Sequence, residues 1–200
     1  VLPDDLSGFD EEHQLSLQVI RENMLKNHGY YKVTEDGVEQ CLISCDDGVY
    51  RFTPPESEEQ DWTVEKLVDE AASDAVLVDL DQDGEKELIL ISPFHGEHIY
   101  FYKKIDGDYK KVYTYDTADF AHAIYGGTLL GKPAVIIGHR KGERNLLLFT
   151  WEQEKGQYQV EILDRDCGPA NVFKYERGTE EVLISTNREI DEVAMYTFEK

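Results

Sequence analysis

Four polar residues recur at nearly equal spacing along the chain, and their types suit metal binding or proton transfer. They are His28, Asp74, His122 and Asn171, and the steps between them are 46, 48 and 49 residues. Histidine supplies a neutral nitrogen ligand or a proton acceptor near neutral pH. Two histidines and one aspartate leave open positions on Zn²⁺, Mn²⁺ or Fe²⁺. If the four positions are structurally equivalent, they predict one ring-shaped site.

Short β-rich runs separated by turn residues fill the intervals between these four positions. The clearest interval contains four runs, at 75–79, 86–92, 98–103 and 109–115, with Gly84, Gly96 and Gly107 in the turns. Alternating apolar and polar residues bounded by glycine are typical of short strands joined by tight turns. A repeat of this length built from four such strands is typical of one blade of a β-propeller.

The repeat predicts an all-β protein: a β-propeller of four blades, each with four antiparallel strands, in a single domain. The blades are expected at residues 28–70, 74–116, 122–164 and 171–200, after an N-terminal extension over residues 1–13. The last blade is short by one strand. Residues 14–23, which include a match to 159–166, are expected to supply that strand and close the ring, which leaves no exposed edge. The alternative is that the chain is part of a five- to seven-bladed propeller.

An acidic motif follows the first strand of the second predicted blade. Residues 79–87 read D-x-D-x-D-G-x-x-E, and they resemble the calcium loop of FG-GAP and VCBS-type propeller repeats. Carboxylates spaced along a tight turn supply the oxygen ligands that Ca²⁺ takes. The resemblance implies a structural Ca²⁺ held by side chains of Asp79, Asp81, Asp83 and Glu87 and by the backbone carbonyl of Glu85. The alternative is a solvated acidic turn without an ion.

Propeller geometry predicts that the ring positions lie on the face opposite this loop, together with the turns between the second and third strands of each blade. A concave patch of histidine, arginine and carboxylate is the expected ligand site. Taken singly, each arginine also fits an ion pair with a neighbouring acid, and the ring also fits a water-filled channel. The residues expected to bind a ligand are His28, Asp74, His122, Asn171, His95, His98, His139, Arg140, Arg144 and Arg188.

Three functions remain open at this point, and the sequence does not decide whether the protein is an enzyme. The first is binding of a polar or anionic small molecule such as a carbohydrate, because arginine suits carboxylate or phosphate and Tyr30, Tyr31 and Tyr125 can stack on a sugar. The second is a metal-dependent enzyme similar to sugar lyases of the VCBS group, with His95 or His139 as base. The third is a scaffold for a protein partner. No nucleophile, P-loop or dinucleotide motif is present.

Composition limits the partners of the chain. The 200 residues hold 42 acidic and 20 basic residues, a formal net charge of −22. This balance argues against nucleic acid and against an anionic membrane surface as partners. The sequence shows no apolar run long enough to span a membrane and no signal peptide in its first twenty residues. Cys41, Cys45 and Cys167 are expected to be reduced, which favours a cytoplasmic protein.

Overall fold

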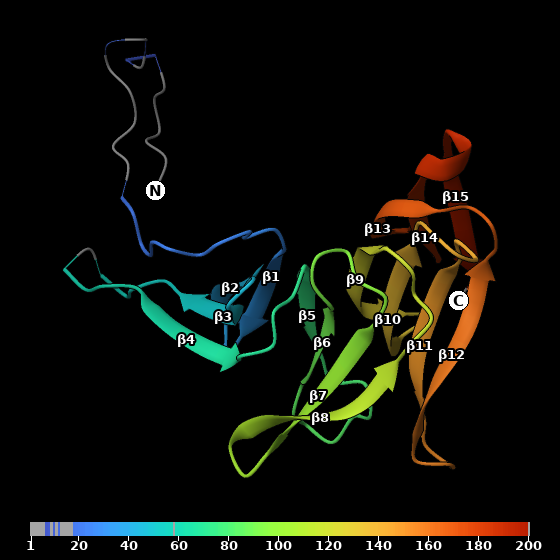
Figure 1. The fold of residues 1–200 in the computed structure, drawn as a ribbon, viewed down its shortest axis with the longest axis horizontal. Coiled ribbons are helices and arrows are strands. Elements are labelled where there is room, and N and C mark those ends of the chain that lie inside the picture. Colours follow the sequence, from blue (N-terminus) through green and yellow to red (C-terminus); the bar gives the residue numbers. More distant parts are fainter. Residues whose placement is uncertain (1–6, 9, 11, 13–17, 58, 200) are drawn as a thin grey trace.

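Antiparallel strands make up almost the whole of the computed structural model, which describes residues 7, 8, 10, 12, 18–57 and 59–199 (Figure 1). Within these residues the strands form four sheets, and each sheet takes up its strands in sequence order. The predicted all-β propeller arrangement with four blades is therefore confirmed. One short 3₁₀ helix, η1 (Arg188–Ile190), lies in the last blade.

The strand bounds are as follows. The first blade contains β1 (Tyr30–Glu35), β2 (Val38–Cys45), β3 (Gly48–Thr53) and β4 (Thr63–Val68). The second contains β5 (Asp74–Val78), β6 (Glu87–Ile91), β7 (Ile99–Ile105) and β8 (Asp108–Tyr115). The third contains β9 (Ala121–Leu129), β10 (Lys132–His139), β11 (Leu146–Glu152) and β12 (Gln157–Asp164). The last contains β13 (Pro169–Arg177), β14 (Glu180–Asn187) and β15 (Glu192–Glu199).

The hydrophobic core lies between neighbouring blades. All five residues of β6 are buried, because blades cover both of its faces, whereas β8 at the outer edge has no buried residue and half of its residues are exposed. The largest buried cluster joins the second and third blades through Ile89, Phe101, Ile137 and Phe149. Similar clusters join the first blade to the second and the third to the last. The second and third blades thus bury both faces of their sheets against neighbouring blades.

The blades form an open arc. The inner strand β5 contacts β1 and β9, and β9 in turn contacts β13. Figure 1 shows the first blade and the last blade at opposite ends of this arc. Glycine permits one of the closest approaches: a Cβ on Gly126 of β9 would lie 2.8 Å from Cβ of Val76 in β5.

The expected closure of the last blade by an N-terminal strand is wrong for the part of residues 14–23 that the structure describes. The last sheet contains only β13, β14 and β15 among the described residues, and residues 18–29 form no strand. Residues 14–17 and most of the expected extension 1–13 lie outside the described residues.

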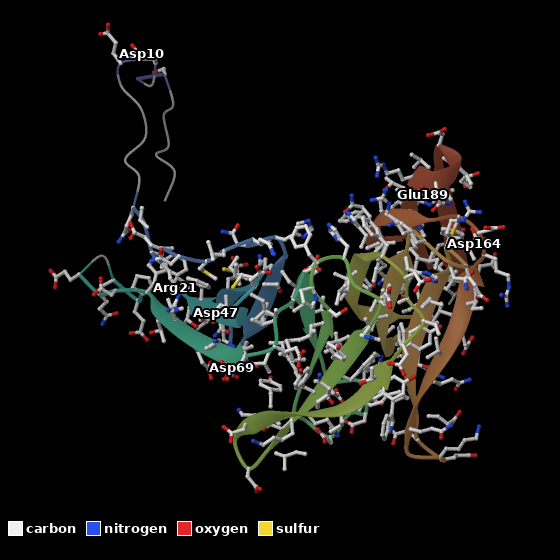
Figure 2. All side chains as sticks on the ribbon, viewed as in Figure 1. Asp10, Arg21, Asp47, Asp69, Asp164 and Glu189 are labelled. Atoms are coloured by element: carbon white, nitrogen blue, oxygen red, sulfur yellow. The ribbon has the colours of Figure 1, made fainter. Side chains whose placement is uncertain are left out.

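The N-terminal segment lies instead along the first blade, which it enters directly. Asp46 N–H donates to the carbonyl of Leu25, and the guanidinium of Arg21 lies 4.5 Å from the ring centroid of Tyr50 in β3. Figure 2 accordingly shows Arg21 beside Asp47 of the first blade, while Asp164 lies at the other end of the molecule. His28 N–H also donates to the carbonyl of Ser44 in β2, so backbone hydrogen bonds hold the end of this segment on the first blade. Among the described residues no helix is long and apolar enough to span a membrane.

Candidate functional site

Three histidines from the first three blades meet on one face of the arc. They are His28, which precedes β1, His95 in the turn between β6 and β7, and His122 in β9. Each offers a ring nitrogen, and these nitrogens lie within 4.8 Å of one another. A Zn–N bond is about 2.0–2.1 Å long, so small side-chain rotations bring three such nitrogens onto one ion. The cluster therefore has the donor set of a transition-metal site.

Backbone carbonyls from the next blade orient two of the three rings. Nδ1 of His28 lies 3.2 Å from the carbonyl oxygen of Ser73, and Nδ1 of His122 lies 2.7 Å from that of Ala170. When Nδ1 carries the proton and donates it to the carbonyl, Nε2 keeps its lone pair. Metal-binding histidines commonly have this second contact, which fixes the tautomer and the ring orientation.

His95 is positioned by a strained turn. Its φ is +56°, in the left-handed region, and its backbone N–H donates to Ser73 Oγ. The buried Ser73 hydroxyl donates in turn to the carbonyl of Ser92, so Ser73 contacts both His28 and the turn that carries His95. Strain held in place by such contacts is frequent at functional sites. The His95 ring stacks on His122 with centroids 4.5 Å apart and planes 8° apart.

The surroundings of the cluster favour unprotonated rings. Burial lowers the pKa of His95, and positive charge on His122 and His28 would lower it further. Burial also lowers the pKa of His122, and Arg188 adds to this effect. Nδ1 of His95 is buried and has no hydrogen-bond partner among the described residues. Neutral imidazoles with free lone pairs are the form that a metal ion binds.

The other two ring positions do not join the histidines. Asp74 begins β5, and its Oδ1 accepts the N–H of Ala75, but it is not part of the ligand group. Burial raises the pKa of this carboxyl to about 7. Asn171 lies exposed near the start of β13, where its backbone N–H donates to Thr186 Oγ1. Equivalent strand positions thus bring together His28 and His122, and the third ligand comes from a turn.

Four of the remaining expected site residues, His98, His139, Arg140 and Arg144, have side-chain partners, whereas Arg188 is placed by its backbone N–H, which donates to the carbonyl of Gly168. His139 is buried, with Nδ1 2.9 Å from the carbonyl of Lys141 and Nε2 accepting the N–H of Asn145, so it has no free nitrogen to act as a base. His98 lies 3.3 Å from Asp116. The side chain of Arg140 pairs with Glu189 and that of Arg144 with Asp166. Figure 2 shows Glu189 at the tip of the last blade.

Several residues beside the cluster were not identified from the sequence. The ring centroid of Phe94 lies 5.4 Å from that of His28, and the centroid of Phe120 lies 5.0 Å from that of His95. Lys26 lies over Phe94 and Lys141 over Phe120. The sequence offered one signal for them, since Phe94 and Phe120 each lie immediately next to or two residues from a histidine of the cluster.

The acidic loop on the opposite face forms ion pairs with a lysine of its own blade. Ligand oxygens of Asp79, Asp81 and Glu87 lie within 4.8 Å of one another. The ammonium of Lys103 in β7 contacts Asp81, lies 2.9 Å from Asp83 and 3.9 Å from Glu87.

Within the loop the acidic side chains also bind backbone groups. Asp83 accepts the N–H of Glu85 and Asp79 accepts the N–H of Gly84. Burial raises the pKa of the Glu87 carboxyl to about 7. The loop thus has the expected turn geometry, and a lysine lies among the carboxylates expected to hold Ca²⁺.

A separate hollow of about 490 Å³ opens on the side of this loop. Its lining includes Gln82, Leu129, Trp151 and Gln153, and no histidine. The hollow therefore lies apart from the histidine cluster. It offers an apolar wall and scattered polar groups rather than a convergent set of titratable side chains.

Solved structures show the same fold at low sequence identity. A protein assigned as a 6-phosphogluconolactonase from Bacteroides uniformis is 13% identical with a TM-score of 0.54, over 86% of this chain and 55% of that one. A counterpart from Bacteroides fragilis is 14% identical with a TM-score of 0.51, over 86% and 55%. A leech intramolecular trans-sialidase is 14% identical with a TM-score of 0.50, over 85% and 31%. This chain thus spans about half the length of the first two.

Sequence comparison adds no family to this likeness of fold. No family model matches the chain, and no curated protein matches it. The resemblance to FG-GAP and VCBS repeats therefore rests on the acidic loop and the repeat spacing alone, whereas the propeller arrangement is shown by the structure.

Proposed function

We propose that this protein binds a divalent transition-metal ion, Zn²⁺ in the first instance, through His28, His95 and His122, and uses it to hold a polar small molecule. The observation that carries the proposal is the convergence of three ring nitrogens from three blades within 4.8 Å. Three histidines are a common zinc donor set, and they leave the fourth position open for a ligand or a water molecule.

The two oriented tautomers support the proposal. His28 and His122 each direct Nδ1 to a backbone carbonyl, so that the donor atoms toward the ion are the two Nε2 atoms. A purely structural role does not require ring nitrogens of three histidines to lie within 4.8 Å of one another. The site lies on the molecular surface, with His28 exposed and the other two rings half-buried, so a ligand has access to it.

A carbohydrate is the ligand class that the similar folds suggest. Two of the proteins of similar fold are named as a 6-phosphogluconolactonase and as a trans-sialidase soaked with 3'-sialyllactose. Their identity to this chain is 13–14%, so the support comes from the shared propeller and not from matched residues. Sugar hydroxyl and carboxylate oxygens both bind Zn²⁺ at an open position.

Metal analysis of the purified protein tests the proposal directly. The wild-type chain is expected to retain close to one equivalent of Zn²⁺ after dialysis. His95→Ala and His122→Ala are expected to lower zinc affinity at least tenfold, because two histidines hold the ion much less tightly than three. His98→Ala is the matched control, since this histidine belongs to the same turn but lies against Asp116.

Replacement of Zn²⁺ by Co²⁺ adds a spectroscopic measurement. Visible absorption typical of a histidine-coordinated Co²⁺ ion should appear with the wild type and His98→Ala and be lost with His122→Ala. If His95→Ala and His122→Ala both keep the wild-type metal content, or if the wild type binds no transition metal, the proposal is wrong.

A further inference from the structure

The last blade has one apolar sheet face that no other blade covers among the described residues. Phe173, Ile184 and Met195 are paired neighbours across β13, β14 and β15. Leu183 and Tyr196, each next to one of them in sequence, pack against the third blade, so this row lies on the opposite, outer face. Phe173 is 64% exposed and Met195 is 56% exposed. An exposed apolar row on a sheet is a feature of surfaces that bind another protein chain.

Rows of the same kind are buried between blades within the chain. Ile89 and Phe101 are paired neighbours in β6 and β7, and both are fully buried where the second blade meets the third. Ile136 and Leu148 of the third blade lie in the cluster that this blade shares with the last one. The outer face of the last blade is the next face in this series. The partner that it lacks is therefore the opposite face of a blade.

The first blade leaves such a face open at the other end of the arc. Tyr50, Phe52 and Trp62 belong to one apolar cluster. It lies on the outer face, because Val49, next to Tyr50 in sequence, packs against the second blade. A hollow of about 240 Å³ opens beside Trp62 and is also lined by Tyr30, which is 66% exposed. A hollow with aromatic walls takes up a projecting apolar side chain, as the central pockets of protein interfaces do.

The two open faces do not meet within one chain, because the first and last blades lie at opposite ends of the arc (Figure 1). In two copies placed head to tail, the last blade of each copy meets the first blade of the other, and two such contacts close a ring. Two chains of four blades give eight, the upper end of the usual range for a propeller. This chain spans 55% of the length of two proteins of the same fold, so longer arrangements of such blades are known.

We propose that this protein forms a two-chain ring in which the last blade of each copy packs on the first blade of the other. Phe173 and Met195 of one copy pack into the hollow formed by Tyr30 and Trp62 of the partner subunit. The contact then repeats the packing of apolar sheet faces that joins successive blades within the chain. It uses neither the histidine cluster nor the acidic loop, so it does not depend on the proposed metal site.

Sedimentation of the full chain tests the inference with one charge placed on each face. Phe173→Glu and Tyr30→Glu change exposed side chains, so both variants are expected to keep the wild-type circular dichroism spectrum. The wild type is expected to sediment as two chains. Each variant alone should raise the dissociation constant of the dimer at least tenfold, since either change breaks both contacts of the ring. Val112→Glu is the matched control, because Val112 is 43% exposed but lies in β8 of the second blade.

An equimolar mixture of the two variants identifies which faces meet. The unchanged last blade of Tyr30→Glu packs on the unchanged first blade of Phe173→Glu, so dimers held by one contact are expected to reappear. A dimer of Tyr30→Glu alone would mean that last blades pair with each other and would overturn the head-to-tail contact. Assemblies that grow beyond two chains would overturn the ring. A wild type that stays monomeric at every concentration would overturn the whole inference.

Discussion

Among single residues, Asp74 has the clearest consequence for stability. Burial raises the pKa of its carboxyl to about 7 in the folded chain, against about 3.9 for an unfolded aspartate. The folded state therefore binds this proton more tightly, and the contribution is fully present below about pH 4. It is lost as the pH rises through 7, where the buried carboxylate becomes charged.

The variant Asp74→Asn removes this charge and keeps the acceptor for the Ala75 N–H. We expect its melting temperature to exceed that of the wild type by about 2–4 °C at pH 8, the shift that corresponds to about 1 kcal/mol in a domain of this length. The difference should shrink as the pH falls from 7 and vanish near pH 4. Thermal unfolding followed by circular dichroism across this range measures it. A difference that is constant with pH would contradict the proposed origin.

At the scale of one loop, Lys103 occupies the carboxylates that a Ca²⁺ ion would need. The lysine comes from β7 and contacts Asp81, Asp83 and Glu87 in the loop between β5 and β6. Asp81 and Glu87 are largely buried, so removal of the ammonium leaves negative charges close together without a partner. Breaking a buried ion pair of this kind is destabilising by up to about 3–5 kcal/mol.

Lys103→Met is therefore expected to lower the melting temperature in calcium-free buffer and to bind Ca²⁺ more tightly than the wild type. Millimolar Ca²⁺ should restore most of the lost stability, since the ion replaces the ammonium. Lys104→Met is the control, because that lysine is more exposed and lies 4.0 Å from Glu85 only. Thermal unfolding with and without Ca²⁺ gives both quantities. If added Ca²⁺ stabilises none of these proteins, the loop is an acidic turn without a metal function.

The strands were predictable from the sequence because their signals are local. The run expected at 109–115 corresponds to β8 (Asp108–Tyr115), whose β-rich residues Val112, Tyr113 and Tyr115 mark it as a strand. Lys103 was not predictable as the loop's partner, because its contact depends on the pairing of β6 with β7 and not on any spacing within the motif. The sequence motif alone therefore indicated a cation site but not which cation.

The histidine site was predictable in part, because the repeat spacing is visible in the sequence. The repeat brought His28 and His122 into equivalent positions, and His95 was expected on the same face as both. Its place as the third ligand depends on the left-handed turn at His95 and on the Ser73 hydroxyl, neither of which has a sequence signature. Asp74 and Asn171 share the repeat position, but strand geometry alone does not direct their side chains to the cluster.

For the whole molecule, the open arc leaves apolar side chains exposed at its end. Phe173, Val193 and Met195 of the last blade are 64%, 71% and 56% exposed. In the second and third blades, both sheet faces are covered by a neighbour. Exposed apolar area beside the edge strand β15 favours association between chains.

We expect the purified chain to self-associate as its concentration rises, with the last blade in the interface. The double change Val193→Lys with Met195→Glu should shift the sedimentation profile toward the monomer without loss of folded structure. Val112→Lys in β8 is the control, since Val112 is also exposed but lies in the second blade. A wild-type chain that sediments as a monomer at every concentration would rule out this surface as an interface.

The histidines also have a mechanical consequence, because each belongs to a different blade. In an open arc each blade contacts only its neighbours, so small rotations at each interface between blades would change the curvature of the whole arc. An ion held by His28, His95 and His122 would connect the first, second and third blades and would fix their relative orientation. Loss of the ion would then allow the blades to move relative to one another while each sheet stayed intact, so the proposed metal would fix the relative orientation of the first three blades.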